Sequence, residues 1–199
     1  MMMLFRTLAI AASLSTGFLP AVAFAQSVNL TRSILPDQPY TLIYPDTMLA
    51  SGGAGEPLVI NHPNAPLQCN LQVIPVEDTD WTAEQALAEL DDASVVTAWA
   101  GTMPGFTLGT KGTTAYQDAT ALFYDGTSPE STMGVPLTLV HTETVSNGRG
   151  YSLDCLFATE VTEQARPIVD FIIANFATRS DADCCVGATV EEPAVEPAQ

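Results

Sequence analysis

The chain has 199 residues, of which 47% are hydrophobic, and it carries 23 Asp and Glu against 6 Lys and Arg, a formal net charge of −17. This charge disfavours partners with anionic surfaces, both nucleic acids and acidic lipid headgroups, because those partners are held by basic side chains. The length fits one domain, with enough apolar residues to fill a core.

The first 25 residues have the order of a secretory signal peptide. Arg6 precedes an apolar run from Leu8 to Phe18, and small residues follow at Ala23 and Ala25. Cleavage after Ala25 would remove 25 residues with one Arg and no acid, which leaves 174 residues at a net charge of −18. Because the apolar run is too short to remain as a membrane anchor, we expect an exported protein in the periplasm, or secreted.

Three strands and two helical segments are predicted next. Apolar or alternating runs bounded by Pro, Gly and Asn indicate strands at Tyr40–Tyr44, Leu58–Ile60 and Leu67–Val76, with a loop over Asp46–Gly55. Thr82 and Gln85 have the spacing of a capping box and begin the first helix. A second helical piece is expected over Ala93–Ala100, before Gly101 and Pro104.

The second half predicts antiparallel strands and a closing helix. Phe106–Tyr124 indicates a hairpin, and Asn147-Gly148 between the apolar runs Val135–Val145 and Arg149–Thr159 is a strong two-residue turn signal. Apolar residues at helical spacing predict a helix over Glu163–Ala177. The expected organisation is a signal peptide (1–25), an N-terminal extension (26–34), one domain (35–185) and a disordered acidic tail (186–199).

This order of elements predicts an α+β fold, a two-layer sandwich in which helices pack on one face of an antiparallel sheet. The layout resembles the PsbP/Mog1-like fold over about residues 36–178. An opening strand that ends at Pro45, a helix in the middle, and the strand Tyr151–Ala158 followed by the helical run Ile168–Phe176 carry the resemblance. The Trp that often follows the opening Tyr-Pro in such proteins is absent here. Such folds serve in binding and assembly, so the resemblance implies no particular reaction.

Cys69 and Cys155 are predicted to form a disulfide. An oxidising compartment favours disulfides. Each of the two cysteines shares a strand face with apolar residues, so both are expected on the same side of the sheet, and only cysteines on the same side can be bridged. The alternative is two buried free thiols on strands that are not neighbours.

Cys184 and Cys185 are adjacent and form a possible vicinal pair. They could act as a redox-responsive clip, bind a soft metal with Asp181 and Asp183, or pair with the other two cysteines. The favoured interpretation is that one or both anchor the segment after the last helix. A thioredoxin-type site would need Cys-x-x-Cys, which is absent.

No catalytic, cofactor-binding or metal-binding residues are predicted. His62 lies in a turn and His141 in a strand, and the metal-protease, nucleophile-elbow and phosphate-loop motifs are absent. Ser152, Asp154 and His141 could be drawn as a triad, but alternation with Cys155 places Asp154 toward solvent.

The leading hypothesis is an exported binding or accessory protein without a catalytic site, with an unknown protein or small-molecule partner. The loops Gly52–Gly55, Asn61–Asn64 and Met103–Gly105 are the suggested binding face. One alternative is a periplasmic hydrolase or thiol-redox enzyme that uses His141 or Cys184/Cys185. Another is a secreted inhibitor that presents a rigid loop.

Overall fold

The computed structural model describes residues 29–33, 39–53, 56–77, 80–131 and 134–185. The predicted signal peptide with its cleavage site at Ala25, and the acidic tail 186–199, lie outside these residues. Within the described ranges, the helices are all too short or too polar to cross a membrane.

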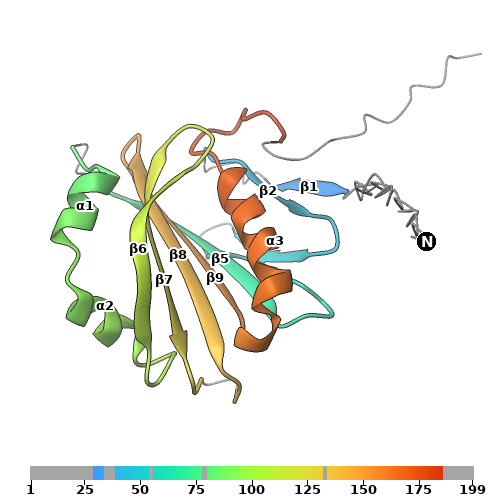
Figure 1. Ribbon diagram of the computed structural model, residues 1–199. Coiled ribbons are helices and arrows are strands. Elements are labelled where there is room, and N and C mark those ends of the chain that lie inside the picture. The colour runs from blue at the N-terminus through green and yellow to red at the C-terminus, as the bar shows by residue number, and fades with distance from the viewer. Residues whose placement is uncertain (1–28, 34–38, 54–55, 78–79, 132–133, 186–199) are drawn as a thin grey trace, which may run out of the picture.

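A seven-stranded antiparallel sheet forms the frame of the molecule, in the strand order β3-β4-β5-β9-β8-β7-β6 (Figure 1). Its strands are β3 (Leu49–Gly52), β4 (Leu58–Asn61), β5 (Leu67–Pro75), β6 (Thr107–Ala115), β7 (Thr120–Ser128), β8 (Leu137–Ser146) and β9 (Arg149–Ala158). A separate two-stranded sheet pairs β1 (Leu30–Ser33) with β2 (Leu42–Pro45).

The local turn and cap chemistry explains several of these boundaries. Asn147 and Gly148 both have positive φ, 51° and 72°, which is the backbone that a tight β8–β9 hairpin requires. Helix α1 (Ala83–Glu89) begins where Thr82 Oγ1 accepts from the backbone N–H of Gln85 at 3.2 Å. Asp91 caps α2 (Asp92–Trp99) in the same way, accepting from the Ser94 N–H at 2.8 Å.

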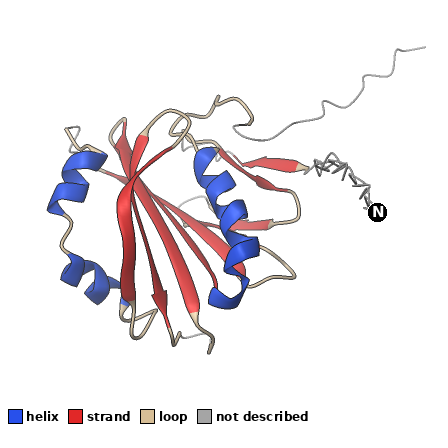
Figure 2. Cartoon of the chain, in the orientation of Figure 1, coloured by secondary structure: helices blue, strands red, loops and turns tan. Residues whose placement is uncertain are grey.

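The helices cover both faces of the sheet, and the predicted coverage of one face is wrong. A 3₁₀ turn (Thr159–Val161) leads into α3 (Thr162–Ala174), which packs with β2 against one face, whereas α1 and α2 lie over the opposite face (Figures 1 and 2). Strand β8 shows why: Leu139 and Val140 are adjacent, both fully buried, and belong to opposite cores. A strand with apolar residues on both sides needs cover on both sides.

Two further differences concern short segments near the N-terminus. The predicted loop Asp46–Gly55 contains strand β3, whose four residues are all exposed, and the expected N-terminal extension contains β1. The closing helix ends at Ala174, three residues before the predicted end, because Ala177 exchanges two backbone hydrogen bonds with Thr41, each of 2.9 Å.

Candidate functional site

The Cys69–Cys155 disulfide is confirmed. The two residues lie directly opposite each other in β5 and β9, with their Cα atoms 4.0 Å apart and their side chains fully buried in the core under α3. Its burial among apolar side chains indicates a structural bond that ties two central strands together.

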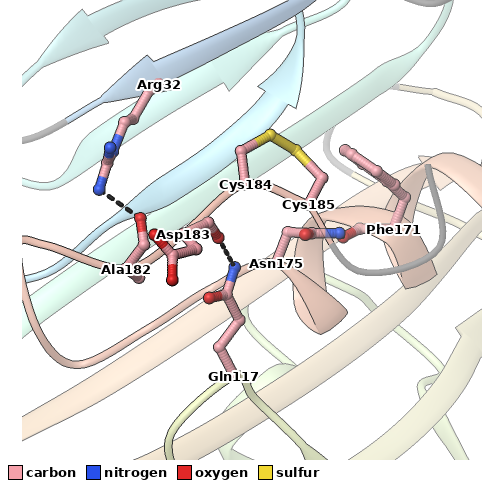
Figure 3. The surroundings of a disulfide bond; sticks show 8 residues. All are labelled: Arg32, Gln117, Phe171, Asn175, Ala182, Asp183, Cys184 and Cys185. Atoms are coloured by element: carbon pink, nitrogen blue, oxygen red, sulfur yellow. Dashed lines mark hydrogen bonds between the residues drawn. A yellow bond between two sulfur atoms is a disulfide. The ribbon is translucent and has the colours of Figure 1, made fainter. Parts of the chain in front are cut away.

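The structure joins Cys184 to Cys185 in an irregular segment after α3 (Figure 3). Arg32 donates to the carbonyl oxygen of Ala182, and the side-chain amide of Gln117 donates to that of Asp183 at 2.8 Å. Pairing with Cys69 or Cys155 is wrong, because those two sulfur atoms are bonded to each other. In the part of the chain that the structure describes, no three His, Cys, Asp or Glu side chains are grouped to hold a metal ion.

His141 is the centre of a buried polar cluster under α2. Its Nδ1 lies 2.6 Å from Asp154 Oδ1, and its Nε2 lies 3.5 Å from Glu143 Oε2. Its ring stacks on Tyr124 with centroids 4.3 Å apart and meets Trp99 edge-on. The indole N–H of Trp99 donates to the Tyr124 hydroxyl at 3.0 Å, so four aromatic and charged groups hold the imidazole in one orientation.

The two carboxylates decide the charge of His141. Burial lowers the pKa of the imidazole, but the hydrogen bonds and attraction from Asp154 and Glu143 outweigh it and raise the pKa to about 9. His141 is therefore an imidazolium at neutral pH. With its pKa at this value and both nitrogens facing carboxylates, it lacks the free basic nitrogen that a hydrolytic general base needs.

Asp154 points into the cluster, and the expectation that it faces solvent is wrong. Its side chain is 22% exposed, and it lies opposite His141 in the β8–β9 register, on the face that α1 and α2 cover. Ser152 lies opposite Glu143, two residues further along the strand, and among the described residues no hydrogen bond joins it to His141. The Ser152–Asp154–His141 arrangement is thus an ion-paired cluster with a neighbouring serine.

A cavity of about 320 Å³ opens beside this cluster, near the β8–β9 turn. We call it the hairpin groove; its polar lining residues are Gln72, Glu143, Thr144 and Ser152, and its other lining residues are Ile74, Val76, Trp81, Val145, Gly150 and Tyr151. Gln72, Ser152 and Glu143 are register partners across β5, β9 and β8, so their side chains form one row on one face. Glu143 thereby links the buried imidazolium to the groove.

The suggested binding face of three loops does not assemble. Gly52 lies at one end of β3, where it pairs with Leu58, and Asn61 lies at the other end of β4, so the first two loops are at opposite ends of the same strand. Met103 is fully buried in the core under α2. The groove is instead lined by strand residues such as Gln72 and Ser152. In the sequence, these polar residues alternate with the apolar residues of the opposite strand face, and this alternation is the signal that could have indicated them.

Comparison with known proteins shows the fold. No family profile and no curated protein matches the sequence. The solution structure of cyanobacterial PsbP (CyanoP) from Synechocystis sp. PCC 6803 superposes with a TM-score of 0.53 at 15% identity, over 81% of this chain and 98% of that chain. The Saccharomyces cerevisiae Ran-binding protein Mog1p gives 0.51 at 10% identity, over 76% of this chain and 96% of its own. The chain therefore has the PsbP/Mog1-like fold, as the resemblance predicted.

Proposed function

We propose that the chain is an exported, non-enzymatic accessory protein that holds a protein partner at the hairpin groove. The observation that carries this proposal is the groove itself, an apolar recess of about 320 Å³ with three in-register polar side chains at one side. A concave apolar surface with a few convergent polar groups is the usual form of a binding site.

Further observations support the proposed export and the proposed class of partner. The order of residues 1–25 is that of a signal peptide, and a buried disulfide suits an oxidising compartment. The Mog1p structure with the same fold is that of a Ran-binding protein, which gives a precedent for a protein partner on this scaffold.

Site-specific photocrosslinking in the native host tests the proposal. A benzophenone amino acid at Ile74, a groove residue that is 48% exposed, should give one adduct with a defined protein in the periplasmic fraction. The matched control is Leu49, which is 61% exposed on the edge strand β3 and lies outside the groove lining. The same adduct from both positions, no adduct from Ile74, or a chain retained in the cytoplasm would contradict the proposal.

A further inference from the structure

The geometry points to an arginine side chain of the partner as the group that the hairpin groove receives, with its guanidinium at Glu143 and Trp81 and its methylene groups along Ile74. This inference rests on the proposed function, since it names the chemistry by which the same groove would recognise its partner. Three features carry it: the shape of the groove floor, its uncompensated negative charge, and the types of side chain that line it.

Gly150 lies on the floor of the groove and adds no side chain to it. In the sheet, Gly150 lies between Ile74 of β5 and Val145 of β8, in the row next to Gln72, Ser152 and Glu143. A Cβ atom on Gly150 would lie 3.3 Å from Cγ1 of both Ile74 and Val76. The missing side chain therefore lets Ile74 and Val76 pack closely over the strand, where they form an apolar wall of the groove along which an extended aliphatic chain can lie.

The groove carries a net negative charge on the side of Glu143. Glu143 is 41% exposed there, and its carboxylate shares the His141 imidazolium with Asp154. Two carboxylates and one imidazolium sum to a single negative charge. No Lys or Arg is among the described residues that line the groove. Lys111, Arg166 and Arg179 are paired with acids elsewhere. Arg149 is next to Gly150 in β9 but alternates to the opposite face of the sheet from Ser152. One incoming positive charge would balance the site.

Arginine matches the lining better than other cations. Its planar guanidinium can lie against the Trp81 indole while its five N–H donors meet the acceptors of Glu143, Ser152 and Gln72. The ammonium group of lysine is not planar and cannot donate two parallel hydrogen bonds to one carboxylate. The volume of about 320 Å³ is at the small end of ligand pockets, and arginine beside an aromatic ring is typical of the few residues that dominate protein interfaces.

Two blocked tripeptides that differ only in charge test the inference. We would titrate the mature chain with acetyl-Leu-Arg-Leu-amide and with its citrulline counterpart, which has nearly the same shape but is neutral, and follow backbone amide shifts by NMR. We expect the arginine peptide to bind at least about tenfold more tightly than the citrulline peptide, the factor expected for one partly exposed charge contact. The shifts should centre on Glu143, Gly150 and Ser152.

Two variants and one control sharpen the test. Glu143→Gln should weaken the arginine peptide about tenfold and abolish the preference over citrulline. Gly150→Val, whose side chain would displace Ile74 and Val76 from the apolar wall, should weaken both peptides. Glu160→Gln makes the same charge change at an exposed site in the 3₁₀ turn, outside the groove lining, and should leave both affinities within about twofold.

Several results would overturn the inference: equal binding of both peptides, no binding of either at millimolar concentration, or equal losses from Glu143→Gln and Glu160→Gln. Failure here is distinguishable from failure of the proposed function. A partner crosslinked at Ile74, together with equal binding of the two peptides, would leave the function standing and remove the arginine. A clear preference for arginine without any crosslinked partner would do the reverse.

Discussion

A protonated histidine between two carboxylates makes the stability of the protein depend on pH. The pKa of His141 is raised to about 9 in the folded chain, against 6.5 in an unfolded one. The contribution of His141 to the free energy of unfolding is therefore fully present below about pH 6.5 and is lost as the pH rises through 9. A shift of this size corresponds to about 3 kcal/mol.

We expect the free energy of unfolding in urea to fall by roughly that amount between pH 6 and pH 9.5, measured against the His141→Gln variant at the same two pH values. All other titrating groups are the same in wild type and variant, so the difference between their two pH dependences of unfolding free energy is due to His141. Parallel pH dependences in wild type and variant would contradict the ion-paired state.

Gly126 is a residue whose missing side chain is required by packing. A Cβ atom there would collide with the Phe106 ring and lie 2.7 Å from the backbone oxygen of Thr107. We expect Gly126→Ala to lower the free energy of unfolding by about 1–3 kcal/mol. Gly112→Ala, on the neighbouring strand β6 with open space around it, should leave it unchanged or raise it by up to about 1 kcal/mol. Urea unfolding of both variants measures the contrast, and equal effects would show that the Gly126 site can adjust.

At the level of elements, the Cys69–Cys155 bond joins β5 to β9 across a sequence separation of 86 residues. In the chain-entropy description, closing a loop of that length stabilises the fold by about 4.5 kcal/mol. We expect reduction to lower the free energy of unfolding by this amount in a Cys184→Ser/Cys185→Ser background, where only the central bond is left. A loss below about 1 kcal/mol would mean that the sheet holds these strands without the bond.

The same variant separates the two disulfides. Cys184 and Cys185 are adjacent, so their bond closes no loop of the unfolded chain. Comparing wild type with Cys184→Ser/Cys185→Ser under oxidising conditions should therefore change the free energy of unfolding by less than about 1 kcal/mol. A larger loss would show that the pair anchors residues 178–185 to the domain.

The elements that were predicted correctly carry their own local signals. The Thr82 cap and the Asn147-Gly148 turn need only neighbouring residues, so their chemistry is readable in the sequence. Strand β3 (Leu-Ala-Ser-Gly) has no alternation of apolar and polar residues, and all four residues are exposed. It forms because it pairs with β4. Its position depends on a tertiary partner, which a local pattern does not encode.

The candidate site could not be predicted from the sequence, for a related reason. His141 and Asp154 meet because β8 and β9 are in register, and α2 then covers the face on which they meet. Strand alternation places Asp154 on the face opposite to Cys155, but it does not show that this face is covered as well. Only the second helical layer, which buries polar and apolar residues together, turns that face into an interior.

In the whole molecule, the acids far outnumber the bases. There are 23 Asp and Glu against 6 Lys and Arg in the sequence, and the described Lys and Arg ion pairs use five acids, namely Asp92, Asp118, Asp125, Asp170 and Asp181. Most acids therefore repel one another over the surface. Such repulsion favours the expanded chain and is reduced by salt.

We expect the free energy of unfolding to rise by on the order of 1–2 kcal/mol between 0.05 M and 0.5 M NaCl, because the screening length falls from about 14 Å to about 4 Å. Replacing four exposed acids by Gln, at Glu56, Glu89, Glu130 and Glu160, removes four negative charges and changes the formal net charge of the full sequence from −17 to −13. This variant should be more stable than wild type at low salt and respond less to added salt. A stability that falls with salt in both proteins would instead mean that the few specific ion pairs outweigh the general repulsion.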